Sequence, residues 1–173
     1  MMIHCESSAT TPYAVRRATR ADADFLTDML VEAANWESHR NRSRAHIMAD
    51  PALAHYVSGW MRPTDLGVVA VVPSGLSIGA AWLRYLPATD PGYGYIRDDV
   101  PELSIGVVGS WRGRGVGRAL LRQILATARA AGVSAVSLSV EPANFAVRLY
   151  RAEGFRIVES SEYAYTMMAE LEG

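Results

Sequence analysis

The chain has 173 residues, of which 50% are hydrophobic and 20% are charged, a mixture typical of one globular domain with a real core. A formal net charge of −1 argues against a general nucleic-acid binder, and no apolar run reaches the roughly 20 residues of a membrane span. We therefore expect a single domain over residues 1–173, with residues 1–12 as a flexible tail and with neither nucleic acid nor a membrane as partner.

The N-terminal stretch MMIHCESSATTP lacks the basic start and apolar block of a secretory signal, which favours a cytoplasmic location. Cys5 is the only cysteine, so an intrachain disulfide is excluded and a reducing compartment is indicated. The four histidines show no metal-ligand spacing with cysteine, and we predict no metal site.

In chain order, the apolar pattern predicts a strand that leads into a helix over residues 14–36 and an interrupted helical segment over residues 43–60. It then predicts a hairpin with strands over residues 67–72 and 77–86, and a single strand over residues 102–108. The interruption falls at Asp50, which can cap a new turn that has Pro51 at its first position.

The clearest helix comes next. Val116, Leu120, Ile124 and Ala128 recur every four residues, and Gly132 ends the pattern. A strand over residues 135–140 and a short helix over residues 144–154 follow, and a final hairpin has its strands over residues 155–160 and 163–171. Because strands and helices alternate only in part, we expect an α/β (α+β) fold with a mixed, mostly antiparallel central sheet flanked by helices.

The stretch VVGSWRGRGVGRALL leads into that helix and has the features of an anion site. Three glycines alternate here with three arginines: Gly113, Gly115 and Gly117 with Arg112, Arg114 and Arg118. The N–H groups and the dipole at a helix start attract an anion, and glycines let the backbone approach it closely. No acidic residue lies between Glu102 and Glu141, so the whole segment is positive.

Two familiar phosphate-binding loops do not match this stretch. The nucleoside-triphosphate loop needs a lysine followed by serine or threonine, and the segment contains no lysine. The dinucleotide fingerprint G-x-G-x-x-G matches at Gly113 and Gly115, but its third glycine position holds Arg118. The pattern R-x-x-G-x-G does fit, at Arg112, Gly115 and Gly117.

On these residues the chain resembles the GNAT superfamily of acetyl-coenzyme-A-dependent N-acetyltransferases. The stretch ELSIGVVGSWRGRGVGRALLRQIL is similar to that family's strand, pyrophosphate loop and helix. The stretch VSLSVEPANFAVRLYRAEGFRIV is similar to its next strand, its asparagine-containing turn and its tyrosine helix ending in Gly-Phe. The resemblance covers residues 102–158 and implies a GNAT-like fold whose strands splay at an acetyl-coenzyme A site.

The resemblance also implies which residues contact acetyl-coenzyme A, the co-substrate. The backbone of the loop would hold the pyrophosphate, through Arg112, Gly113, Arg114, Gly115, Val116, Gly117 and Arg118. The backbone of the strand would pair with the pantetheine arm, through Ile105, Val107 and Val108. Asn144 sits where the family commonly hydrogen-bonds the coenzyme arm. A turn or helix N-cap is an equal interpretation of this asparagine.

Two residues are candidates for proton transfer. Tyr150 occupies the position of the family's usual general acid, which protonates the departing thiolate; packing in the core is the alternative. Glu102 opens the strand where some family members carry a catalytic glutamate. An exposed strand-end charge is an equal interpretation of Glu102, with a bound water as the base.

The resemblance implies acetyl transfer to a primary amine by direct attack, on a small-molecule or peptide acceptor that the sequence does not name. The segment PGYGYIRDD and the aromatic residues Trp36, Tyr56 and Trp60 are expected to build the acceptor pocket. The alternative is a non-catalytic coenzyme-A-binding regulatory or sensing module of the same fold. The final hairpin, residues 163–171, is a candidate contact for a homodimer.

Overall fold

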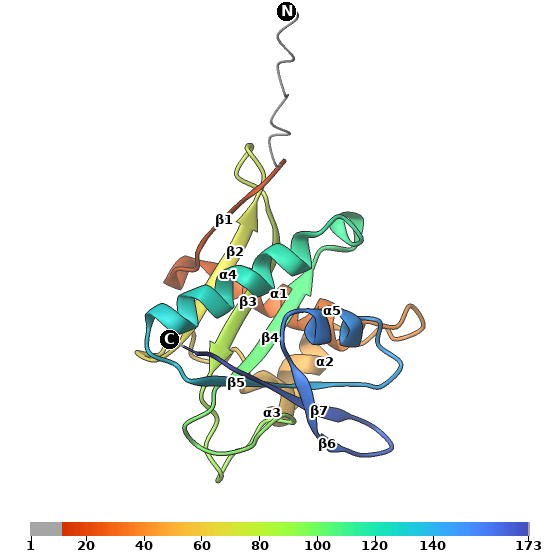
Figure 1. The fold of residues 1–173 in the computed structure, drawn as a ribbon. Helices are drawn as coiled ribbons and strands as arrows, with labels where there is room; N and C mark the ends of the chain where they lie inside the picture. The colour runs from red at the N-terminus through yellow and green to blue at the C-terminus, as the bar shows by residue number, and fades with distance from the viewer. Residues whose placement is uncertain (1–11, 173) are drawn as a thin grey trace, which may run out of the picture.

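A seven-stranded sheet runs through the structure, a computed structural model that describes residues 12–172 (Figure 1). The predicted tail, including Cys5, lies outside the described residues apart from Pro12. Across the sheet the strands are β1 (Ala14–Arg17), β2 (Leu66–Val71), β3 (Ser77–Arg84), β4 (Glu102–Val107), β5 (Ala135–Val140), β7 (Tyr165–Glu170) and β6 (Arg156–Ser160). Only β4 and β5 pair in parallel among the described strands, so the prediction of a mixed, mostly antiparallel sheet is confirmed.

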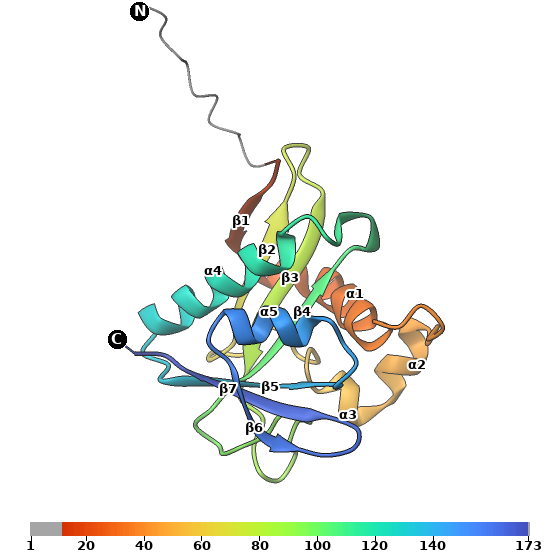
Figure 2. The same ribbon diagram turned by 45° about the vertical axis from the view of Figure 1, so that its right-hand side comes forward.

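Helices cover both faces of this sheet (Figure 2). They are α1 (Ala23–Ala34), α2 (Arg44–Ala49), α3 (Pro51–Ala54), α4 (Val116–Ala130) and α5 (Ala146–Ala152), with 3-10 turns at Arg20–Asp22 and Gly109–Trp111. None of the helices within residues 12–172 combines the length and the apolar character needed to cross a membrane.

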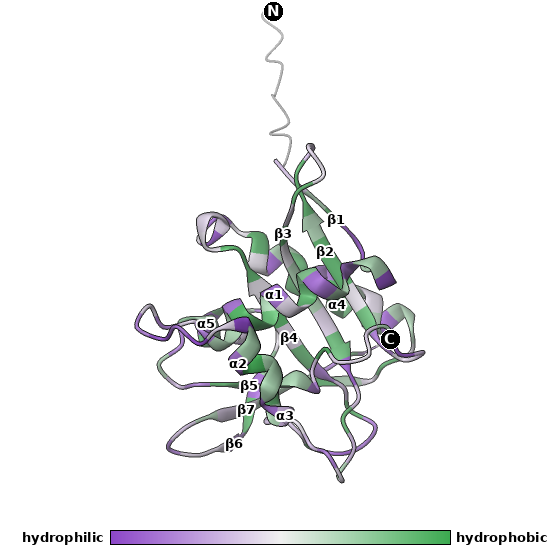
Figure 3. Cartoon of the chain, turned by 180° about the vertical axis from the view of Figure 1, so that it is seen from behind, coloured by the Kyte–Doolittle hydropathy of each residue, from purple (hydrophilic) through white to green (hydrophobic). Residues whose placement is uncertain are grey.

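The central strands are buried on both faces because their side chains alternate between two cores. Val68 and Ala81 pack with α4 and α5 on one face, whereas Val69, Ala80 and Trp82 pack with α1 on the other. Figure 3, seen from behind, shows the hydrophobic colouring gathered on β2 and β3. The continuous apolar runs of these strands follow from this double burial.

Helix boundaries follow the predicted capping residues. The Asp50 side chain accepts a hydrogen bond from the backbone of Ala52 at 3.0 Å, with Pro51 at the first position of α3. Helix α4 begins after Gly115, whose φ of +82° is in the left-handed region that favours glycine. Gly132, with φ +80°, follows the end of the helix.

A buried ion pair fixes the segment between α3 and β2. Arg84 is fully buried and contacts Asp65 at 2.6 Å. Its guanidinium also donates to the carbonyls of His55 and Ser58, at 2.9 and 2.7 Å. Each buried N–H group of a guanidinium needs a hydrogen-bond acceptor, and here two backbone carbonyls serve as acceptors. The ion pair therefore holds the backbone immediately before Tyr56 against β3.

Candidate functional site

The parallel junction of the sheet opens into a cavity. Strand β4 pairs with β3 along its whole length, but its register with β5 is limited to Glu102 opposite Ser137. The Ser137 N–H donates to Pro101 at 3.0 Å, and beyond this rung the two strands diverge. A cavity of about 820 Å³ lies along the opening, so the strands splay as the family resemblance implied.

Backbone groups of β4 face this opening at alternate residues. Val108 donates its N–H to Ile78 at 2.9 Å, which identifies it as a hydrogen-bonded position of the ladder with β3. Along a strand, residues whose backbone groups bond to one neighbouring strand alternate with residues whose backbone groups point to the opposite side. Ile105 and Val107 therefore direct their N–H and C=O groups toward β5. Val108 also accepts from Trp111 at 2.8 Å, so both of its backbone groups have partners within the fold and neither is free for a ligand.

The glycine-arginine loop ends at the N-terminus of α4. Gly113 and Gly115 have φ values of +70° and +82°, conformations that other residues adopt only with strain. The first backbone bond of the helix runs from Ala119 to Gly115 at 3.1 Å. This leaves three N–H groups at the helix start without a helical acceptor, those of Val116, Gly117 and Arg118. They form the anion-attracting end of the cavity, which Gly117 lines.

The arginines of the loop are held by partners of their own. Arg112 contacts Glu32 at 2.5 Å and so braces the loop against α1. Arg118 lies 3.5 Å from Glu153, and Arg114 covers a neighbouring indole ring at 5.1 Å from its centroid. Among residues 12–172 no ion pair involves Arg114, so its charge is the least neutralised of the three. The loop therefore presents backbone donors first and guanidinium charge second.

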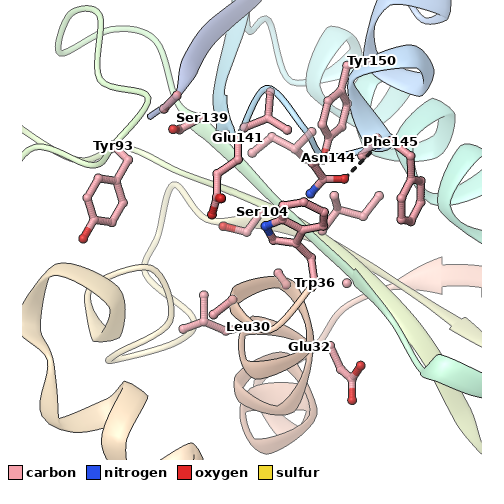
Figure 4. A pocket seen from close by; sticks show the side chains of 18 of the residues that line it. Leu30, Glu32, Trp36, Tyr93, Ser104, Ser139, Glu141, Asn144, Phe145 and Tyr150 are labelled. Atoms are coloured by element: carbon pink, nitrogen blue, oxygen red, sulfur yellow. Dashed lines mark hydrogen bonds between the residues drawn. The ribbon is translucent and has the colours of Figure 1, made fainter. Parts of the chain in front are cut away.

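Asn144 and Tyr150 form one wall of the cavity (Figure 4). The Asn144 side-chain oxygen accepts from Ala146 at 2.9 Å, which leaves its Nδ2 donor unused by the residues that the structure describes. Tyr150 is 8% exposed, and its ring packs against Phe155 with centroids 5.8 Å apart. Burial raises the pKa of Tyr150 above its ordinary value, so the hydroxyl keeps its proton at neutral pH.

Glu102 lies at the closed end of the cavity and is only 2% exposed. The interpretation as an exposed strand-end charge is therefore wrong: the residue begins β4 beneath the loop that contains Gly94. Its Oε1 accepts from the Gly94 N–H at 2.7 Å and from the Tyr56 hydroxyl at 3.0 Å. Burial raises the pKa of Glu102, and these hydrogen bonds to the charged form oppose that rise.

Comparison with known proteins identifies the fold around this cavity. The model of the acetyltransferase (GNAT) family matches residues 24–155, more than half of the chain. The chain belongs to the GNAT acetyltransferase family. A search of curated proteins gave no match.

Several solved structures resemble this GNAT chain. The PaiA N-acetyltransferase from Thermoplasma acidophilum, in complex with coenzyme A, has a TM-score of 0.63 at 15% identity, over 92% of this chain and 99% of that one. The putative acetyltransferase YncA from Salmonella typhimurium, with acetyl-CoA, has a TM-score of 0.67 at 21% identity, over 94% and 96% of the two chains. A GNAT-family acetyltransferase from Staphylococcus aureus Mu50 reaches 0.67 at 15% identity, over 92% and 99%. At these identities the likeness concerns the fold.

The aromatic residues expected at the acceptor end of the GNAT cavity divide into two groups. Trp36, Tyr56 and Tyr93 line it. Trp60 does not: it is buried in the core on the α1 face, where its indole donates to Thr19 at 2.9 Å. The expectation for Trp60 is wrong because the turn after α3 directs this ring into the core between the sheet and α1.

An ion pair that the sequence did not reveal lies at the end of this GNAT cavity that Trp36 lines. Arg40, between α1 and α2, donates twice to Glu141, just after β5, at 2.5 and 2.8 Å. The guanidinium also lies over the Trp36 ring, 5.7 Å from its centroid. These hydrogen bonds lower the pKa of Glu141. The partners are 101 positions apart, so no local signal could have connected them.

No metal centre is evident in the part of the chain that the structure describes: within residues 12–172 there is no group of three or more His, Cys, Asp or Glu side chains close enough to share an ion.

Proposed function

We propose that the protein transfers the acetyl group of acetyl-coenzyme A to a primary amine. One observation carries this proposal: the cavity between β4 and β5 joins the α4 N-terminus, Tyr150 and the buried carboxylate of Glu102. A donor site for an anionic ligand, a protonated hydroxyl and a proton acceptor thus share one space. Membership of the GNAT family supports acetyl transfer as the reaction.

The residues present fit an extended, anionic co-substrate. The N–H groups of residues 113–118 would hold the pyrophosphate, because they surround a helix start with no acidic side chain in the loop. The backbone of Ile105 and the N–H of Val107, which lack a strand partner on the β5 side, would pair with the amides of the pantetheine arm; the Val107 carbonyl already accepts from Arg112 at 3.2 Å. Asn144 would donate through Nδ2. Acetyl-coenzyme A supplies the activated acetyl group as a thioester.

Glu102 and Tyr150 divide the proton transfers of this reaction. The amine attacks in its neutral form, having lost its ammonium proton to water, and its nitrogen must lose one further proton to become an amide. A carboxylate with a raised pKa is better matched to that transfer than an exposed one, so Glu102 takes this proton as the new C–N bond forms and the C–S bond breaks. The Tyr150 hydroxyl, protonated at neutral pH, gives its proton to the departing sulfur. No covalent enzyme intermediate is needed.

Thiol release from acetyl-coenzyme A in the presence of a panel of amines, with mass spectrometry of the products, tests this function. The panel covers peptide N-termini, lysine side chains, polyamines and amino acids. All 17 of the lysine and arginine residues of the chain are arginine, so self-acetylation of lysine adds no background. Coenzyme A binding without turnover across the panel would favour a non-catalytic module. Thermal stabilisation by ATP or NAD but not by coenzyme A would refute the donor assignment.

A further inference from the structure

Tyr56 connects the acceptor-side loop to Glu102 through a chain of hydrogen bonds. The Tyr93 N–H donates to the Tyr56 hydroxyl oxygen at 2.7 Å, and the hydroxyl lies 3.0 Å from Glu102 Oε1. A phenol has a single proton to donate. Because the backbone N–H can only donate, the hydroxyl accepts there and must direct its own proton to the carboxylate. The donor direction in this network is therefore fixed.

The same contacts distinguish the two oxygens of Glu102. Oε1 accepts two hydrogen bonds, from Tyr56 and from the Gly94 N–H at 2.7 Å. Oε2 is buried and makes no hydrogen bond of good geometry among residues 12–172, although the Gly92 backbone lies beside the carboxylate and favours its charged form. An oxygen already facing two donors is a poor place for a further proton. The geometry leaves Oε2 as the atom that gains the proton.

The loop above the carboxylate fits so closely that side chains are excluded. A Cβ placed on Gly92 would overlap Glu102 Oε2 and would lie 2.6 Å from its Oε1. A Cβ on Gly94 would lie 2.6 Å from the backbone of Leu138 and 3.0 Å from Glu102 Oε1. Contacts this short do not occur, so a side chain at position 94 would displace backbone and one at position 92 would displace the Glu102 carboxylate. The loop therefore lies directly against the carboxylate, and the hydrogen bonds from Tyr56 and Gly94 hold its Oε1.

We propose that Tyr56 is a positioning residue of the acetyl-transfer reaction, which holds Glu102 with Oε1 fixed and Oε2 as the proton-accepting atom. This inference rests on the proposed function. Tyr56 does not touch the reacting groups in it: it acts by donating to Glu102, which favours the ionised carboxylate. Oε2, buried and otherwise unpaired, is then held in one place, and its basicity comes from burial rather than from Tyr56.

Two other pairs of charged groups lie beside this network, and each is already paired. His55 packs edge-on against the Tyr56 ring at 4.8 Å and contacts Asp90 at 2.9 Å. Arg84, opposite Glu102 in the ladder with β3, is bound to Asp65. From β5, the facing residue is the uncharged Ser137. A titration assigned to Glu102 must therefore disappear in Glu102→Gln.

Carbon-13 NMR titration of the glutamate carboxyls tests the proposal without requiring turnover. The Glu102 signal is assigned by its loss in Glu102→Gln. Tyr56→Phe removes one hydrogen bond to a charged group and should raise the pKa of Glu102 by about one to two units. The acidic limb of the pH profile of kcat/KM should move upward by the same amount. Tyr165→Phe, which removes the hydroxyl of a β7 tyrosine that neither lines the cavity nor contacts Glu102, should move neither.

The outcomes separate this inference from the proposed function. If Tyr56→Phe is active but neither the Glu102 pKa nor the acidic limb of its kcat/KM profile has shifted, the role of Tyr56 is overturned and acetyl transfer is not. A shifted pKa in a protein that acetylates no amine overturns the proposed function instead. If Tyr56→Phe does not fold, 3-fluorotyrosine at position 56 replaces it. Its more acidic hydroxyl donates more strongly and should lower the Glu102 pKa; an unchanged or raised value overturns the proposal.

Discussion

Replacing Tyr150 by phenylalanine removes one hydroxyl group from the cavity wall. Among the hydrogen bonds within residues 12–172, none involves this hydroxyl, and the ring that packs against Phe155 is retained. The free energy of unfolding should therefore change by less than about 1 kcal/mol. Loss of a general acid costs about 10²- to 10⁴-fold in turnover, which corresponds to roughly 3–5 kcal/mol on the barrier. The catalytic effect should exceed the stability effect several-fold.

The assay measures kcat from thiol release, coenzyme A affinity by calorimetry and stability by urea unfolding. We expect Tyr150→Phe to lower kcat by at least about 100-fold with little change in affinity or stability. Tyr165→Phe, at a partly buried tyrosine on β7 that does not itself line the cavity, is the matched control and should keep its activity. Unchanged turnover in Tyr150→Phe would refute the acid assignment, and equal losses in both variants would indicate a structural effect.

Two further substitutions test the donor site and the buried carboxylate. Gly117→Asp places a negative charge at the free N–H groups of α4, where a Cβ meets only ordinary contacts, the nearest at 3.7 Å. Coenzyme A affinity should fall at least about tenfold, and the fold should be kept because aspartate is favourable at a helix start. Gly117→Ala is the control and should lose much less coenzyme A affinity. Equal losses of affinity in the two variants would contradict the anion site. Glu102 has a pKa raised above 4.5, so its contribution to stability is complete below about pH 4.5 and is lost as pH rises through the folded pKa. In urea unfolding from about pH 4 to 8, wild type should therefore lose stability relative to Glu102→Gln; a constant difference would contradict the raised pKa.

The sequence predicted those elements whose signals are local. The break at Asp50 and Pro51 is a capping signal within three residues, and the α4 stripe repeats every four. Glycines with positive φ, such as Gly115, punctuate the chain where turns were expected. The family resemblance supplied the splay of β4 and β5, which no propensity of single residues could indicate.

The site was harder to predict because its properties come from residues distant in sequence. Glu102 looks like an exposed charge until Tyr56, 46 positions earlier, and the loop at Gly94 cover it. Arg112 looks like a phosphate ligand, yet Glu32, 80 positions earlier, takes its guanidinium. Tertiary partners decide burial, charge and availability, and a pattern within one segment does not contain them.

Strand β4 has two unlike edges, and amide hydrogen exchange should distinguish them. Ser104 and Gly106 direct their N–H groups to β3, whereas those of Ile105 and Val107 face the opening. Without ligand, exchange along this strand should alternate between slow and fast from one residue to the next. Coenzyme A should slow only the fast positions. The two half-sheets, β1–β4 and β5–β7, are thus joined by one rung, and in the proposed binding mode the co-substrate would take the place of a strand between them.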